Sequence, residues 1–337
     1  MKKSLMTLGV LALFVLMAYG QEKKFALYSV AFYNMENLFD TIHDEGKNDY
    51  EYLPNGTNQW NTMKYKAKLK NMSEILSLLS TDKLPMGPAI IGVSEIENYR
   101  VLEDILKQPA LADRGYQYVH YEGEDQRGVD CAFFYNPKLF ELTNSKLVPY
   151  VYINDTIHKT RGFLIASGNI AGEKMHFIVN HWPSRAAASP ARERAGEQVR
   201  AIKDSLLRED SAAKIVIMGD MNDDPMDKSM AVALGAKRKP ADVGPTDLYN
   251  PWWDTLKKGY GTLMYKGKWN LFDQIVFTGN LLGTDRSTLK FYKHEIFRRD
   301  FMFQKEGKYK GYPKRTQAGG VWLSLIHISE PTRLRCI

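Results

Sequence analysis

The chain has 337 residues, of which 44% are hydrophobic and 25% are charged, and its formal net charge is +7. These values exclude an intrinsically disordered chain, which would combine few hydrophobic residues with a high net charge. The length allows one large hydrophobic core or two modest ones. Cys131 and Cys336 are the two cysteines, so no disulfide framework is expected.

Residues 1–20 have the pattern of a secretory signal peptide. A positively charged start, "MKK", precedes the apolar run "LMTLGVLALFVLM" and the small residues of "AYG". This run is shorter than the roughly 20 residues that a membrane-spanning helix needs, which argues against an uncleaved anchor. We therefore expect cleavage near Gly20 and Gln21 and export to the periplasm or the medium.

Short apolar runs rich in β-branched and aromatic residues, bounded by turn residues, predict seven strands. In chain order they are residues 25–34, 89–98, 128–137, 163–170, 175–183, 214–222 and 271–280. Two further segments, 63–80 and 189–210, repeat apolar residues at three- and four-residue steps and predict amphipathic helices. Several strands follow one another without a helix between them, which favours mixed or antiparallel sheets. No repeat or linker divides residues 21–322, so we expect one domain there.

Polar side chains of similar chemistry stand at or near the ends of five of these runs. One such residue is more often a cap or a buried hydrogen-bonding group than part of a site. Five are harder to explain in that way, because strand ends meet at one rim of a sheet. The residues are Asn34, Glu95, His181, Asp220 with Asn222, and Asp273.

These residue types suit phosphate-ester cleavage. A hard, oxygen-ligated Mg²⁺ neutralises the phosphoryl oxygens and helps to generate hydroxide. A histidine or an amide can stabilise the transition state, and an aspartate can orient or deprotonate water. The sequence has no HxxxH pair or cysteine cluster for zinc, no GxSxG elbow, no P-loop and no Rossmann fingerprint.

The motifs "NMENLFD", "VSEIEN", "RGVDCAFFYNP", "VNHWPSR", "GDMNDDP" and "WNLFDQIVF" resemble, in this order, those of the endonuclease/exonuclease/phosphatase superfamily. That superfamily includes relatives of deoxyribonuclease I and exonuclease III, and the chain looks most like its exported branch from Bacteroides-type bacteria. The resemblance extends from about Val30 to Gln274. It implies an α+β (α/β) fold, a four-layer α/β/β/α sandwich of two mixed sheets flanked by helices.

The resemblance also implies a role for each residue of the rim. Glu95 would be the principal Mg²⁺ ligand, with Asn34 beside the metal, and Mn²⁺ or Ca²⁺ could replace Mg²⁺. His181 would bind the scissile phosphate, and Asp220 would position or activate water, assisted by Asn222. Asp273 would orient the last catalytic histidine of the family.

Arg127 stands where the resemblance places a phosphate-contacting arginine, although a plain surface ion pair is an equally good interpretation. Glu97, Asp223 and Asp224 are interpreted as solvated or turn residues. Cys131 is interpreted as a small buried side chain.

The C-terminus departs from the family pattern. The family closes with Ser-Asp-His, but no such motif follows Asp273, and "LSLIHISEPTRLRCI" stands in its place. The stretch "SLIHISEPTR" can be written as translated transposon end and sequencing adaptor. We therefore expect residues 323–337 to be an artefactual tail, His327 not to be the missing histidine, and turnover to be impaired.

Together these features predict an exported, Mg²⁺-dependent phosphodiesterase, an endonuclease for DNA or RNA that needs no protein partner and is a monomer. A phosphatase or a sphingomyelinase-like phospholipid phosphodiesterase is the alternative within the superfamily. A non-catalytic nucleic-acid-binding protein on the same fold is a second alternative. The aromatic, lysine-rich segment 249–269 could stack bases or, through Trp252 and Trp253, meet a lipid surface, but packing is the expected role of its aromatic residues.

Overall fold

The computed structural model describes residues 26–81, 84–153, 157–285, 287–315 and 328–336, the last range as backbone only. The expected signal peptide and His327 lie outside the described residues. Within the described residues, no helix has the length and apolar character needed to cross a bilayer.

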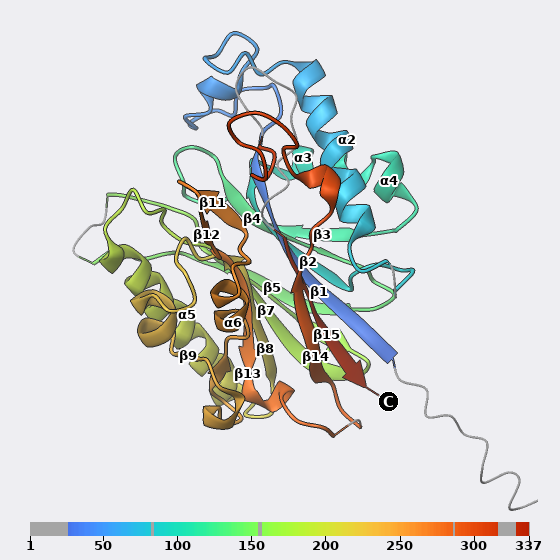
Figure 1. The fold of residues 1–337 in the computed structure, drawn as a ribbon, viewed down its shortest axis with the longest axis vertical. Helices are drawn as coiled ribbons and strands as arrows, with labels where there is room; N and C mark the ends of the chain where they lie inside the picture. Colours follow the sequence, from blue (N-terminus) through green and yellow to red (C-terminus); the bar gives the residue numbers. More distant parts are fainter. Residues whose placement is uncertain (1–25, 82–83, 154–156, 286, 316–327, 337) are drawn as a thin grey trace, which may run out of the picture.

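Two mixed sheets form the centre of the molecule (Figure 1). In sheet order, the first contains β14 (Lys290–Ile296), β15 (Ile328–Cys336), β1 (Ala26–Leu38), β2 (Ile90–Ile96), β4 (Asp130–Tyr135) and β3 (Gln117–His120). The second contains β5 (Glu141–Val148), β6 (Phe163–Ile170), β7 (Glu173–His181), β8 (Lys214–Asp220), β13 (Asp273–Thr278), β10 (Leu248–Tyr249) and β9 (Ala236–Lys237). The β1–β2 and β7–β8 pairs are parallel, whereas β2–β4, β6–β7 and β8–β13 are antiparallel.

The helices α2 (Thr62–Leu78), α3 (Tyr99–Leu106) and α4 (Pro109–Ala112) cover the outer face of the first sheet, and α5 (Ser189–Glu209) covers that of the second. The short α6 (Trp253–Lys257) packs through Leu256 against the cluster between the sheets, and β11 (Leu263–Tyr265) with β12 (Lys268–Asn270) forms a separate hairpin. Short helical turns are η1 (Tyr50–Tyr52), η2 (Ser229–Ala233), η3 (Pro240–Asp242), η4 (Gly279–Leu281) and η5 (Asp300–Met302). All seven predicted strands and both predicted helices are confirmed.

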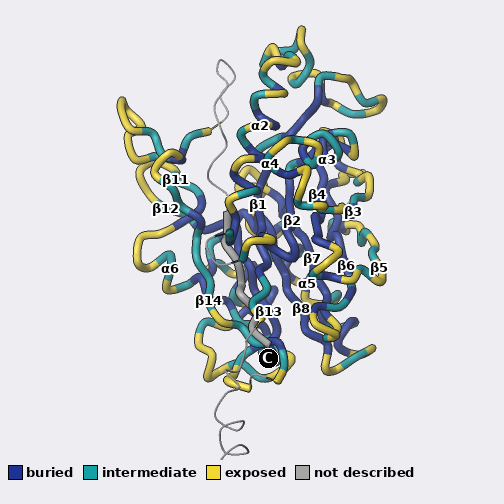
Figure 2. Tube along the Cα trace, turned by 90° about the vertical axis from the view of Figure 1, so that its right-hand side faces the viewer, coloured by how far each residue is buried: buried dark blue, intermediate teal, exposed yellow. Residues whose placement is uncertain are grey.

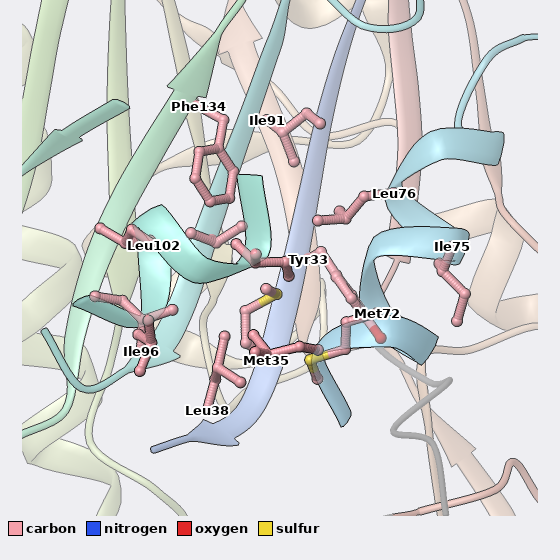
Figure 3. Packing of buried hydrophobic residues seen from close by; sticks show 14 of the residues in the cluster. Tyr33, Met35, Leu38, Met72, Ile75, Leu76, Ile91, Ile96, Leu102 and Phe134 are labelled. Carbon is pink, nitrogen blue, oxygen red and sulfur yellow. The ribbon is translucent and has the colours of Figure 1, made fainter. Parts of the chain in front are cut away.

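Three hydrophobic clusters separate four layers. Between the sheets, Phe133 of β4 faces Phe177 of β7 with ring centroids 5.7 Å apart. On the outer face of the first sheet, Tyr33 and Ile91 lie in one cluster with Met72 and Leu76 of α2 (Figure 3). On the outer face of the second sheet, the buried side of α5 packs against β7 and β8. Figure 2 shows that the central strands of the sheets are buried. This arrangement is the expected α/β/β/α sandwich.

The backbone of β15 lies between β1 and β14. It pairs antiparallel with β1 from Ala26 opposite Cys336 to Tyr33 opposite Ile328, and antiparallel with β14 on its other side. Backbone groups, which every residue type supplies, make these bonds. A segment of foreign sequence can therefore occupy this position, and the expectation of an artefactual tail stays a prediction.

Candidate active site

The six predicted strand-end residues meet at one rim of the sandwich. Asn34 and Glu95 come from β1 and β2 of the first sheet, at the end where β1 leads into the upper part of the molecule in Figure 1. On the second sheet, Asp220 at the end of β8 lies opposite both His181 of β7 and Asp273 of β13. Because these three strands are neighbours, His181, Asp220 and Asp273 form a row facing the first sheet.

Asn34 connects the two sheets at this rim. Its Nδ2 donates to Glu95 Oε1 at 3.0 Å and to Asp220 Oδ2 at 3.0 Å. Its Oδ1 accepts a hydrogen bond from the backbone of Glu36 at 2.7 Å, which holds the amide in this orientation. A single amide therefore holds two carboxylates close together without a positive charge between them.

The ligand atoms needed for a divalent metal converge beside Asn34. One ligand atom each from Glu95, His181 and Asp220 lies within 4.8 Å of the others, and Glu95 Oε1 is 3.5 Å from His181 Nε2. Two carboxylates suit a hard cation such as Mg²⁺, and the imidazole also suits Mn²⁺. The residues present therefore fit the metal that the sequence predicts.

Backbone strain is concentrated at two of these residues. Glu95 has φ of 57° and Asn222 has φ of 52°, in the left-handed region that non-glycine residues rarely occupy. Each is held by hydrogen bonds: Asn37 N donates to Glu95 Oε2 at 3.0 Å, and Asn222 N donates to Asp220 Oδ1 at 2.9 Å. Strain of this kind persists where the surrounding contacts determine the conformation, as they do at functional sites.

Gly92 allows the two sheets to approach each other beneath the rim. A Cβ atom at Gly92 of β2 would lie 2.5 Å from the sulfur of Met218 on β8. Gly92 precedes Glu95 by three residues, and Met218 precedes Asp220 by two. The absence of a side chain at Gly92 thus brings the strands carrying two of the metal-ligand candidates together.

The carbonyl of Trp182 connects the rim to a buried ion pair. It accepts from Asn222 Nδ2 at 3.0 Å and from Arg161 Nη2 at 2.9 Å. Arg161 Nη1 is 3.0 Å from Asp125 Oδ2, and both side chains are 7% exposed. Burial acts to raise the pKa of Asp125, but Arg161 and Arg127 outweigh it and hold that pKa below its usual value. Neither Arg161 nor Asp125 was identified from the sequence.

The sequence matches a known protein family over most of its length. Residues 29–331 match the profile described as the endonuclease/exonuclease/phosphatase family. The chain belongs to this family. It is a family of phosphoesterases that typically depend on divalent metals, in agreement with the ligand atoms of Glu95, His181 and Asp220. No curated protein matches the sequence.

Solved structures share the fold of this endonuclease/exonuclease/phosphatase family member. A family protein from Bacteroides thetaiotaomicron is 13% identical, with a TM-score of 0.55 over 93% of this chain and 96% of that one. D. rerio TDP2 complexed with a single-strand DNA product is 14% identical, with a TM-score of 0.55 over 93% and 100%. A mannosyl-6-phosphatase from Bacteroides thetaiotaomicron is 13% identical, with a TM-score of 0.54 over 91% and 99%. At these identities the likeness shows the fold alone.

Arg127 lies in the loop before β4. Its side chain is 51% exposed, and its Nε is 3.3 Å from Asp125 Oδ1. Its backbone nitrogen also donates to that oxygen, at 2.9 Å. The ion pair that the sequence allowed is thus present, and the phosphate contact stays a prediction.

The solvated interpretation of Glu97 is wrong. Glu97 is 2% exposed and accepts from Asp40 N at 2.7 Å, and burial raises the pKa of its carboxyl to about 9. Asp223 lies in the loop after β8, as expected, but it is buried and pairs with Arg192 at 2.9 Å. Asp224 also accepts a hydrogen bond, from Leu271 N at 2.7 Å. Cys131 is buried, as expected.

Lys68 of α2 is a further residue that the sequence did not identify. Its ammonium donates to the carbonyls of Glu36 and Asn37, the second at 2.9 Å, and lies 5.5 Å from the Trp60 ring centroid. Burial lowers the pKa of Lys68 to about 8. Lys68 therefore holds the segment whose Asn37 nitrogen supports Glu95. In the sequence Lys68 is one of four lysines at every second position of residues 64–70, so no local signal distinguishes it.

A second group of metal-ligand types lies at the β3–β4 end of the first sheet. Ligand atoms of His120, Glu122 and Asp130 lie within 4.8 Å of one another. His120 Nε2 is 3.2 Å from Asp130 Oδ2, and Gly123 N donates to Asp130 Oδ1 at 3.0 Å. These contacts join the end of β3, the start of β4 and the loop between them, so we interpret the group as a structural hydrogen-bonded cluster.

The arrangement can bind and cleave a phosphate ester. A divalent cation held by Glu95, with Asp220 and Asn34 beside it, would neutralise phosphoryl oxygens. His181, 6% exposed, can donate to the phosphate on the face next to Glu95. Asp220, 4% exposed, offers a carboxylate that can orient an attacking water, with the Asn222 amide adjacent.

Proposed function

We propose that this protein is an exported, Mg²⁺-dependent phosphodiesterase that acts as an endonuclease on DNA or RNA. The observation that carries the proposal is the convergence of Glu95, His181 and Asp220 within 4.8 Å. Asn34 connects the two carboxylates, and Asn222 stands beside Asp220. This set contains a hard metal site, a phosphate-binding donor and a water-orienting carboxylate.

Nucleic acid as the substrate is supported by charge and by one relative. Residues 21–322, without the expected signal peptide and tail, contain 42 basic and 38 acidic residues, and their net charge of +4 is compatible with a polyanionic substrate. The fold of D. rerio TDP2, which holds a single-strand DNA product, covers 93% of this chain. A phosphatase is the second candidate, because a mannosyl-6-phosphatase from Bacteroides thetaiotaomicron shares the fold equally well.

The experiment offers the purified protein four substrates: plasmid DNA, RNA, mannose 6-phosphate and sphingomyelin. Each is incubated with Mg²⁺ or with EDTA, with Glu95→Gln as the inactive reference and Glu209→Gln, an exposed acid on α5, as the matched control. We expect Mg²⁺-dependent cleavage of DNA or RNA by the wild type and by Glu209→Gln. Hydrolysis of the sugar phosphate or the lipid with both nucleic acids intact would contradict the endonuclease.

The proposal includes slow turnover by the chain as it stands. Asp273 is fully buried and lies opposite Asp220 in the pairing of β13 with β8. No Ser-Asp-His follows it in the sequence. We propose that residues 323–337 take the place of a segment carrying that motif. Replacing them with the last strand of a family member that contains Ser-Asp-His should raise the cleavage rate about 100-fold or more, the contribution of a positioned acid or base. An unchanged rate would contradict this part of the proposal.

A further inference from the structure

A pocket of about 470 Å³ lies between the β11–β12 hairpin and the loop of residues 303–315. We define its polar lining as the basic-aromatic pocket: the cations Lys266, Lys308 and Arg315 and the tyrosines Tyr265, Tyr309 and Tyr312. None of the residues that line it is acidic. A pocket of similar size between α2 and α4 has both signs of charge, including Lys66, Lys70, Glu74 and Asp104. Charge, rather than size, therefore distinguishes the basic-aromatic pocket.

We propose that the basic-aromatic pocket binds single-stranded nucleic acid, a subsite that rests on the proposed endonuclease function. Tyr265 is 62% exposed and Tyr309 is 45% exposed, so part of each ring is open to solvent and can stack on a base. Lys266 Nζ lies 5.3 Å from the Tyr265 ring centroid, and Lys308 Nζ lies 5.6 Å from that of Tyr309. Each tyrosine thus has an ammonium beside it, which suits a base and its neighbouring phosphate.

The pocket is formed before any ligand binds, because both walls are held together. Residues 303–315 fold back on themselves: Gln304 N donates to Tyr312 O and Gly311 N donates to Gln304 O, both at 2.8 Å. The guanidinium of Arg298 lies over Trp269 of the hairpin at 5.1 Å and over Phe303 of the loop at 4.7 Å. A preformed site loses little conformational entropy on binding.

The hairpin that forms one wall is joined directly to the active-site rim. Two residues separate Asn270, the last residue of β12, from Asp273. Thr262 Oγ1, at the other foot of the hairpin, accepts from Asp273 N at 3.3 Å, and Arg185 Nη1 donates to Asn270 Oδ1 at 3.3 Å. Tyr265 pairs with Lys268 across the hairpin, and from Lys268 to Asp273 an extended chain spans at most about 17 Å. A strand bound in the pocket can therefore continue to the rim within a few nucleotides.

The chemistry of the lining favours nucleic acid over a membrane. A lipid-facing surface needs exposed aliphatic or tryptophan side chains that enter the acyl region. Here the exposed aromatic residues are tyrosines. Trp269 is half-buried, with the guanidinium of Arg298 over its ring. Both walls project from the body of the protein, with the hairpin exposed in Figure 2.

The test measures binding of a fluorescent oligothymidylate to the full chain in EDTA, where no cleavage occurs, at several salt concentrations. Tyr265→Ala and Tyr309→Ala should each weaken binding about five-fold or more, as loss of one stacked base predicts. Lys266→Ala combined with Lys308→Ala should reduce the slope of log affinity against log salt by about 1.4. Lys66→Ala combined with Lys70→Ala removes the same charge from the α2–α4 pocket and should leave the binding unchanged.

The outcomes separate this inference from the proposed function. If the wild type cleaves DNA in Mg²⁺ but the pocket variants bind the oligonucleotide as the wild type does, the pocket assignment is overturned and the endonuclease stands. If the Lys66/Lys70 variant loses affinity equally, binding follows net charge and the pocket assignment is overturned. If the pocket variants lose binding to anionic phosphatidylserine vesicles while keeping oligonucleotide binding, the ligand is a membrane surface and the assignment is also wrong.

Discussion

Glu95 Oε1 lies 3.5 Å from His181 Nε2, although the two residues belong to different sheets. The contact closes the rim across the sandwich, where Gly92 of β2 lies close to Val179 of β7 and Met218 of β8. A carboxylate and an imidazole at this distance can contact the same cation. Substitution of either residue should therefore impair the same reaction.

His181→Gln should reduce kcat by about 100-fold with little change in KM, because a lost transition-state donor costs this much. Steady-state cleavage of DNA in Mg²⁺ measures the effect. His176→Gln is the matched control, since His176 lies on the same strand and its Nδ1 contacts Ser167 Oγ at 2.7 Å, away from the rim. Equal losses in the two variants would show that His181 has no special role.

Asn222→Ala and Asn222→Gly should both lose activity, because each removes the amide beside Asp220. They should differ in stability, since φ of 52° is unfavourable for alanine and acceptable for glycine. We expect the glycine variant to be more stable than the alanine variant by about 1 kcal/mol in urea unfolding. Equal unfolding midpoints would contradict strain at this position.

Arg161→Met should destabilise the fold by about 3 kcal/mol, because it removes the buried partner of the Asp125 carboxylate and leaves only the half-exposed Arg127 beside it. Adding Asp125→Asn should recover a large part of this loss, since the amide oxygen can still accept from Arg127 N. Chemical denaturation of the two single variants and the double variant gives the coupling energy. Additive losses would mean that the ion pair contributes little.

His294 should make the fold less stable in acid. Burial against Trp252 lowers the pKa of His294 to about 4, below the value of 6.5 expected in the unfolded chain. Between these values the unfolded chain binds a proton that the folded chain does not, so stability is lost as pH falls from about 6.5 to about 4.

The loss attributable to His294 is at most about 1.4 kcal/mol per pH unit. His294→Gln keeps a partner for Thr255 Oγ1, whose distance to His294 Nε2 is 3.0 Å, and should give a flatter profile of unfolding free energy against pH. Parallel profiles for the wild type and the variant would show that His294 does not titrate in this way.

The sequence was sufficient for those elements whose side chains carry a clear period. The strands β2, β7 and β8 are buried along most of their length and each contains an apolar run, and α5 begins at Ser189 where the Ser-Pro pair predicts it. The polar strand β5 was missed, because most of its residues are exposed or half-buried. Its place at the edge of the second sheet comes from pairing with β6, which no local pattern reveals.

The site was predictable to a similar degree. Asn34, Glu95, His181, Asp220 and Asp273 were found because each follows or begins an apolar strand. Their supporting residues were not found, because Lys68 and Arg161 resemble ordinary surface cations in the sequence. Both become buried only through tertiary contacts, to the carbonyls of Asn37 and Trp182. Long-range hydrogen bonds of this kind leave no periodic signal along the chain.

The central claim is that Glu95, with Asp220 and Asn34, holds a divalent metal, and Mn²⁺ binding tests it without requiring turnover. The free Mn²⁺ signal in electron paramagnetic resonance is followed during titration of the wild type, Glu95→Gln and the control Glu209→Gln, with circular dichroism to confirm folding. We predict a site that Mg²⁺ displaces in the wild type and in Glu209→Gln, weakened about 10-fold or more in folded Glu95→Gln. Equal Mn²⁺ affinity in all three proteins would contradict the account.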